Sequence, residues 1–425
     1  MLQHRISLLA LGILASTAAL AEDQSTAKGF IEDSHMDLFF RNGYMYRDYK
    51  HGRDDKSEWG QAATATFTSG FTQGTIGVGA DVFGMYALNL DENGKRAGAA
   101  GIDFFKQDSD GNPASDLARA GGAVKARLSN TVIKYGDQMP SLPVLSYDNS
   151  RLLPETYSGT LITSKEIEGL EINVGRFTSE VRKSAEGHDS GGLKRIDVYG
   201  GSYKFTDNFS GSLYAQDNED VARKQYMNLN YVIPMADRES LTLDFNGYKT
   251  KLNQDWADEF NHGNRDNTIW SLSAAYNIGV HTFMVAHQRN NGDTGYLYGG
   301  YQSGDYIGDG GTTIWLANSY WSDFNGEDER SWQGSYSLDF SEYGVPGLSY
   351  TVAYVYGDNI KTEETSNGKE REIFNQLKYV VPSGPAKDLS VKLRGSWVRV
   401  SNDARSYNDD GNEVRVFVEY PVNIF

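Results

Sequence analysis

Apolar and polar residues alternate one by one in many short stretches of this chain, and no other feature limits its fold as strongly. In the stretch at 389–400, Leu389, Val391 and Leu393 alternate with Lys392 and Arg394. Successive side chains of a β-strand point to opposite faces, so this pattern predicts a strand with one apolar and one polar face. It recurs at 36–48, 241–248 and 269–278, and helical periodicity is absent. We therefore expect an all-β chain. Alternation alone does not tell a soluble sandwich from a barrel whose polar face lines a channel.

The connections between these strands come in two lengths. Short turns are predicted at 69–73, 129–130, 164–169, 206–208, 235–240, 279–281, 341–347 and 382–388. Long polar segments, such as 252–267 and 290–311, lie between them. Tight turns that alternate with long loops are typical of outer-membrane barrels, and these turns together with an opening and a closing strand give about 18 strands. We expect a transmembrane antiparallel β-barrel that uses residues 22–425 as one domain.

The N-terminal residues 1–21 resemble an export signal. Arg5 precedes an apolar run at 6–15, and Ala19-Leu20-Ala21 has the small-x-small pattern of a signal peptidase site. The apolar run is shorter than the roughly 20 residues of a membrane-spanning helix, so a signal peptide is favoured over an anchor. The mean hydropathy of −0.54 fits a barrel as well as a soluble protein, because barrel strands average lipid-facing and lumen-facing residues.

Charge and cysteine content exclude several classes of function. A formal net charge of −17 argues against nucleic acid as a partner, since phosphate binding needs a basic surface. With no Cys, the exported chain has no disulfide, no thiolate metal site and no cysteine nucleophile. No sequence pattern indicates a cofactor.

Several long motifs, in order along the chain, are similar to those of one known family. They are "AKGFIEDSHMDLFFRNGYMYRD", "SGFTQGTIGVGADVFG", "RAGGAVKARLS", "NSRLLPETYSGTLITSKEIEGLE", "LANSYWSDFNGEDERSW", "YGVPGL", "VVPSGPAKDLSVKLR" and "EVRVFVEYPVNIF". Together they resemble the OprD family of substrate-specific porins of pseudomonads, and the resemblance spans nearly all of residues 22–425.

The resemblance implies a monomeric barrel of about 18 strands, narrowed by inward-folded loops and lined by a row of basic side chains, the basic ladder, that guides carboxylate-bearing solutes. One branch of the family resembles channels for basic amino acids, and the other resembles channels for cyclic and aromatic carboxylates such as benzoate, vanillate or glucuronate. The run "NSRLLPETYSGTLITSKEIEGLE" is more similar to the second branch. The implied partners are small carboxylates and the lipid and lipopolysaccharide of a Gram-negative outer membrane, with the protein a monomer or a weak trimer.

The period-two alternation of the strands places five basic residues on polar faces, and we expect them to form part of the basic ladder. Their positions match the ladder of the family. Arg41 and Arg47 lie on the polar face of the first strand, Lys392 and Arg394 on that of a late strand, and Arg415 on that of the last strand. Because the first and last strands of a closed barrel are neighbours, we expect these residues to converge on one patch of wall.

The loops supply further candidates. The family pattern carries Arg151 where the inward loop returns, and Arg182, Arg289 and Asp293 resemble contributions of later loops to the constriction. If the loop at 106–148 folds inward, Tyr147, Asp148 and Ser150 would face the basic residues across the channel. The competing interpretation is ordinary solvated loop charge, or a loop that packs only on its extracellular neighbours.

Two other classes of function have weaker support in the sequence. The chain has no G-x-S-x-G, H-E-x-x-H or P-loop motif, so we do not expect an enzyme, although His287 lies near Asp293 in sequence. The abundant Tyr and Trp also fit an exported carbohydrate-binding β-protein, but aromatic residues of a barrel commonly mark the two membrane interfaces.

Overall fold

The computed structural model describes residues 23–91, 102–107, 112–187, 192–298, 302–303, 306–307 and 314–425. The predicted signal peptide at 1–21 lies outside the described residues, as do parts of the predicted loops at 106–148 and 290–311.

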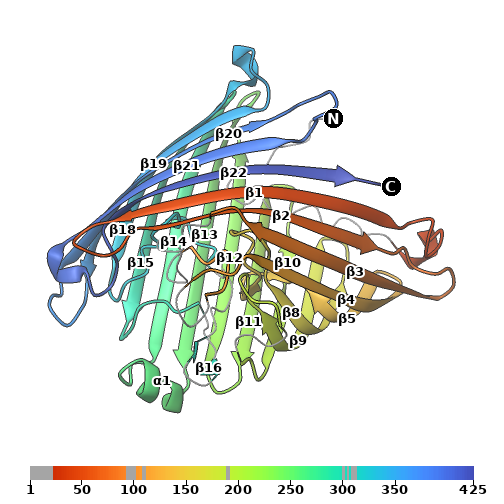
Figure 1. Ribbon diagram of the computed structural model, residues 1–425, viewed down its shortest axis with the longest axis horizontal. Coiled ribbons are helices and arrows are strands. Elements are labelled where there is room, and N and C mark those ends of the chain that lie inside the picture. The colour runs from red at the N-terminus through yellow and green to blue at the C-terminus, as the bar shows by residue number, and fades with distance from the viewer. Residues whose placement is uncertain are drawn as a thin grey trace.

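An 18-stranded antiparallel sheet closes on itself to form a barrel (Figure 1). Its strands are β1 (His35–Tyr49), β2 (Lys56–Thr68), β3 (Ile76–Asn89), β4 (Asp116–Leu128), β5 (Thr131–Gln138), β8 (Thr156–Ser164), β9 (Leu170–Val181), β10 (Ile196–Lys204), β11 (Phe209–Asn218), β12 (Ala222–Pro234), β13 (Glu239–Leu252), β14 (Asp266–Ile278), β15 (His281–Gly292), β18 (Arg330–Asp339), β19 (Leu348–Ile360), β20 (Gly368–Val380), β21 (Ser390–Val400) and β22 (Gly411–Asn423). The expected strand number and architecture are confirmed.

Pairing of β1 with β22 closes the barrel, and in Figure 1 the red first strand lies beside the blue last strand. The register runs without a break from Tyr49↔Gly411 to Asp37↔Asn423. Every predicted short turn joins two neighbouring strands, for example 129–130 between β4 and β5 and 279–280 between β14 and β15. The short turns share one end of the barrel, which is the periplasmic end in barrels of this type.

Short elements outside the wall lie mainly in the connections of the other end. They are the hairpins β6 (Ser141–Leu142) with β7 (Leu145–Ser146) and β16 (Gln302–Ser303) with β17 (Tyr306–Ile307), the helix α1 (Gln254–Phe260), and the 3-10 helices η2 (Gln24–Thr26), η3 (Phe340–Tyr343) and η4 (Asn402–Ala404). The Asn253 side chain caps α1, a helix of 7 residues that is too short to show a helical period in the sequence. None of the described helices is long and apolar enough to cross a membrane.

The two faces of the wall follow the alternation of the sequence. On β3, the outward side chains of Ile76, Val78 and Val82 are 51–60% exposed. Inward positions of the wall are buried, as Met45 of β1 and Ala62 of β2 illustrate. An apolar outer face suits lipid, and the strands therefore present their polar face to the lumen.

Loops fold into the lumen and fill part of it. Phe104, Phe105 and Leu152 pack in one buried cluster with Met45 and Met85 of the inner wall. Gly43 and Gly60 face each other on β1 and β2, and a Cβ at Gly60 would lie 2.3 Å from Cδ1 of Leu152. These glycines let the loop approach the wall closely.

A second cluster fills the opposite side of the barrel. Leu142, Val144 and Leu145 pack with Tyr226 and Tyr248 of β12 and β13.

Candidate solute-binding site in the channel

The five strand residues of the basic ladder lie side by side on the inner wall. In the sheet register Arg394 of β21 faces Arg415 of β22, and Arg415 faces Met45 of β1, between Arg41 and Arg47. Closure of the barrel thus joins residues that are more than 350 positions apart in sequence.

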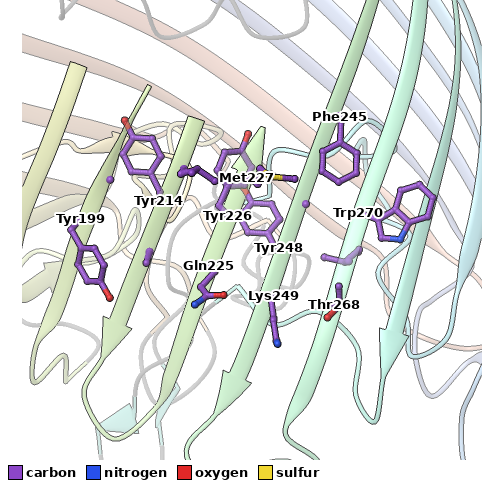
Figure 2. A pocket seen from close by; sticks show the side chains of 15 residues that line it. Tyr199, Tyr214, Gln225, Tyr226, Met227, Phe245, Tyr248, Lys249, Thr268 and Trp270 are labelled. Atoms are coloured by element: carbon purple, nitrogen blue, oxygen red, sulfur yellow. The ribbon is translucent and has the colours of Figure 1, made fainter. Parts of the chain in front are cut away.

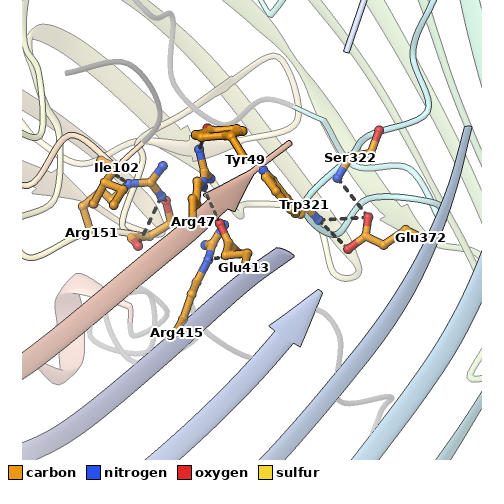
Figure 3. Close-up of polar contacts among 10 residues, drawn as sticks. Arg47, Tyr49, Ile102, Arg151, Trp321, Ser322, Glu372, Glu413 and Arg415 are labelled. Atoms are coloured by element: carbon orange, nitrogen blue, oxygen red, sulfur yellow. Dashed lines mark hydrogen bonds and ion pairs between the residues drawn. The ribbon is translucent and has the colours of Figure 1, made fainter. Parts of the chain in front are cut away.

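Two glutamates divide the ladder into ion-paired groups. Glu413 Oε2 accepts from Arg47 Nε at 2.7 Å, and Glu413 Oε1 accepts from Arg415 Nε at 2.5 Å (Figure 3). Glu419 Oε1 accepts from Arg41 Nε at 2.8 Å, and its Oε2 lies 3.9 Å from Lys392 Nζ. These carboxylates fix the guanidinium groups and offset part of their charge.

Arg394 differs from the other arginines of the ladder. Within the described part of the chain, its buried Nε and Nη2 have no hydrogen-bond acceptor. Its guanidinium carbon lies 4.8 Å from the centre of the Phe374 ring, so the aromatic face orients the group without satisfying its N–H donors.

Arg394 lines a small pocket of about 100 Å³ in the lumen. The other lining residues are Arg41, Asn149, Ser150, Gln376, Lys392, Arg415, Phe417 and Glu419. The pocket thus combines four basic side chains, an aromatic ring and a polar loop, with Glu419 as the one carboxylate among its described lining residues.

The loop at 147–151 contacts the basic ladder directly. Arg41 Nη1 donates to Asn149 Oδ1 at 2.9 Å and to the carbonyl oxygen of Arg151 at 2.5 Å. The Arg151 side chain donates to the carbonyl oxygen of Ile102 and to Ser150 Oγ, and therefore connects two inward loops (Figure 3).

Asp148 and Tyr147 belong to this loop but do not line the pocket. Asp148 is buried, accepts from the Ser150 N–H at 2.6 Å and lies 3.2 Å from Lys183 Nζ. Burial acts to raise the pKa of Asp148, but Lys183 and Arg151 outweigh it and hold the pKa below its usual range. Tyr147 is half-buried against the second apolar cluster.

Three predicted loop residues do not join the pocket. Arg289 is on β15 and shares the outward parity of Phe283 and Val285, which are 49% and 60% exposed, so its placement in the lumen was wrong. Asp293 is exposed, and its carboxylate accepts from the N–H groups of Arg265 and Asp266 instead of facing the ladder.

Arg182 lies just after β9 and is not among the residues that line the pocket. Its carbonyl oxygen accepts from Arg119 Nη1 at 2.7 Å. The neighbouring Lys183, which the sequence interpretation did not select, forms the contact with Asp148.

A second group of inward basic residues was also missed. Arg119, Lys125 and Arg127 alternate with small or apolar residues on β4 and are buried. Lys125 lies 2.7 Å and Lys134 of β5 2.6 Å from the carboxylate of Asp81. The parity rule that located Lys392 and Arg394 would have found Arg119, Lys125 and Arg127.

The chain matches known proteins over almost its entire length. The model of the outer membrane porin, OprD family, matches residues 28–424. The chain belongs to the OprD family. Porins of this family are passive channels, so the protein is a substrate-specific porin of a Gram-negative outer membrane and not an enzyme.

Individual members of the OprD family are also similar to this chain over almost its whole length. Porin D of Pseudomonas aeruginosa is 42% identical over 96% of this chain and 94% of its own length. The crystal structure of OccAB1 of Acinetobacter baumannii is 40% identical with a TM-score of 0.89, covering 95% of this chain and 100% of the other. The structure of Pseudomonas aeruginosa OpdK with vanillate is 30% identical with a TM-score of 0.81, covering 93% and 100%.

Proposed function

We propose that this porin takes up small solutes that carry a carboxylate, with cyclic and aromatic carboxylates as its substrate class, and that the carboxylate binds at Arg394. The observation that carries the proposal is the pair of buried N–H donors of Arg394 without an acceptor among the described residues. A guanidinium group presents such donors in the geometry that suits the two oxygens of a carboxylate.

The neighbouring cations strengthen the binding of a carboxylate at the site but still allow its release. A contact between unit charges at about 4 Å is worth roughly 1 kcal/mol in bulk water and about 4 kcal/mol at an effective dielectric constant near 20. Lys392 and Arg415 flank Arg394. Glu413 and Glu419 offset part of the attraction that these cations exert on an anionic solute. A solute can thus pass from one site of moderate affinity to the next, as conduction requires.

Two aromatic rings support the cyclic class of substrate. Phe417 lines the pocket, and the Phe374 ring lies against the Arg394 guanidinium. A flat apolar ring attached to the carboxylate would pack on Phe417 while its oxygens accept from Arg394. The OpdK structure with vanillate provides a precedent within the family.

The second candidate substrate class is basic amino acids and the peptides that contain them. It is favoured by the 42% identity to Porin D, compared with 30% to OpdK. Such solutes also carry a carboxylate, so the role of Arg394 is common to both candidates. We also propose that residues 1–21 are a cleaved signal peptide and that the barrel functions as a monomer or a weak trimer.

Uptake into proteoliposomes tests the proposal and separates the two classes. We expect benzoate, vanillate and glucuronate to enter faster than arginine and lysine, and faster uptake of the basic amino acids would reject the proposed class. The double variant Lys392→Ala/Arg394→Ala should lower carboxylate uptake about tenfold, the effect of losing one charge-assisted hydrogen bond. Arg289→Ala, on the outer face, is the matched control and should leave uptake unchanged.

A further inference from the structure

A groove of about 490 Å³ lies on the wall formed by β10 to β14, away from the solute pocket (Figure 2). Its outward-facing side chains include Tyr199, Leu213 and Met227, which are 53%, 65% and 39% exposed. Because these residues have the lipid-facing parity of the barrel, the groove opens toward the membrane.

Gly247 forms the floor of the groove. It faces Met227 on one side and Trp270 on the other in the sheet register. A Cβ at Gly247 would lie 3.3 Å from the Phe245 ring and 3.5 Å from Cβ of Trp270, so any longer side chain would project into the groove. The depression therefore depends on the absence of a side chain at this position.

A polar row borders this apolar floor on the side nearer the extracellular loops. Gln225, Lys249 and Thr268 face one another across β12, β13 and β14, two residues beyond the Met227–Gly247–Trp270 row. Figure 2 shows the ends of the Gln225 and Lys249 side chains on the same side of the groove. The groove thus has an apolar half and a half that can donate hydrogen bonds.

Lys249 is the charged residue of this row and is exposed. Its neighbours on the same face are ion-paired, Arg223 with Asp217 at 3.2 Å and Lys251 with Asp266 at 3.9 Å. Within the described ranges, Lys249 has no carboxylate within ion-pairing distance. An ammonium group at the border between lipid chains and headgroups is stabilised by an anionic headgroup.

We propose that this groove binds one lipopolysaccharide molecule of the outer leaflet. A lipid phosphate accepts from Lys249, with Gln225 and Thr268 donating to the same headgroup, and one acyl chain lies over Gly247 between Met227 and Trp270. The charge of Lys249 and its position at the extracellular end select a phosphorylated lipid of that leaflet.

Native mass spectrometry of the purified full-length protein with added lipid A measures this binding. Lys249→Gln should weaken lipid A binding about fivefold, the effect of one basic residue at an anionic lipid surface. Gly247→Leu should weaken it by filling the groove. Lys251→Gln, on the same strand and face but paired with Asp266, is the control and should bind like the unmodified protein.

Different lipids identify the occupant. Dephosphorylated lipid A should bind the unmodified protein as weakly as lipid A binds Lys249→Gln. Equal binding of both lipids, equal competition by phosphatidylglycerol, or a dimer that Gly247→Leu abolishes would overturn the proposal. Uptake of carboxylates should be unchanged in all three variants, so the solute site is tested separately.

Discussion

At the scale of single residues, Glu413 shows how the basic ladder is held in place. Its buried carboxylate contacts both Arg47 and Arg415. Removal of one partner from a buried ion pair leaves an uncompensated charge, which commonly costs about 3–5 kcal/mol. The ladder is therefore a network in which each acid fixes two cations.

We expect Glu413→Gln to lower the free energy of unfolding by about 3–5 kcal/mol, measured by thermal or denaturant unfolding in detergent. Glu342→Gln is the control, because the Arg238–Glu342 pair is about half exposed and should contribute less than about 1 kcal/mol. Equal destabilisation by the two substitutions would contradict the network.

Strand parity predicted the inward face of five basic residues but was not applied to β4, where Arg119, Lys125 and Arg127 also face inward. Arg41, Arg47, Lys392, Arg394 and Arg415 all face inward because the period of a strand leaves only two choices of face. Arg289 was misplaced because it was assigned to a loop, although its parity with Phe283 and Val285 was readable. The free N–H groups of Arg394 were not predictable, since they depend on contacts from three strands and a loop.

At the scale of elements, the inward loops decide the width of the channel. Leu152 and Phe105 occupy the space above Gly60, which the wall leaves open for them. These contacts follow no local period in the sequence. The alternation of the strands therefore predicted where the loops lie along the chain, but not which residues of the wall they contact. The family resemblance supplied the expectation that they fold inward.

Gly60→Val should push Leu152 and Phe105 away from the wall, at a cost of about 1–3 kcal/mol for overpacking. We expect the inward loop to be displaced and the single-channel conductance in planar bilayers to increase. Gly84→Val is the control, because a Cβ at Gly84 meets no atom within 4 Å. Identical conductance in the two variants would exclude this role of Gly60.

The loop at 314–329 carries a half-buried acid, Asp323, whose pKa is raised. Burial, with Glu372 and Glu370 nearby, raises the pKa of Asp323 to about 7. The folded state therefore retains this proton longer than the unfolded chain, whose aspartates have a pKa of about 3.9. The stabilisation that comes from this raised pKa of Asp323 is fully present below about pH 4 and is lost as the pH rises to about 7.

Hydrogen exchange of this loop, corrected for the intrinsic rate, should accelerate between about pH 4 and pH 7 and level off above about pH 7. Asp323→Asn cannot ionise and should lose this part of the change. Asp293→Asn changes an exposed carboxylate that caps the start of β14 and should keep the full change. Unaltered pH dependence in Asp323→Asn would exclude the assignment.

At the scale of the whole molecule, barrel closure brings together the residues of the proposed solute site. Pairing of β1 with β22 places Arg41 and Arg47 beside Arg415, while β21 contributes Lys392 and Arg394. The short turns and the period-two strands predicted this closure, because about 18 strands of one chain leave no other arrangement without free edges. Loop residues Leu142, Val144 and Leu145 pack on Tyr226 and Tyr248 of the wall.

Selection by the carboxylate of the solute is tested by comparing benzoate with benzamide, a neutral solute of nearly the same shape. In proteoliposomes, we expect benzoate to enter about tenfold faster than benzamide through the unmodified porin, and Arg394→Gln to remove most of that difference. Arg399→Gln, on the same strand with the outward parity of Trp397, should preserve it. Equal uptake of benzoate and benzamide by the unmodified porin would show that the basic ladder does not select solutes by their carboxylate.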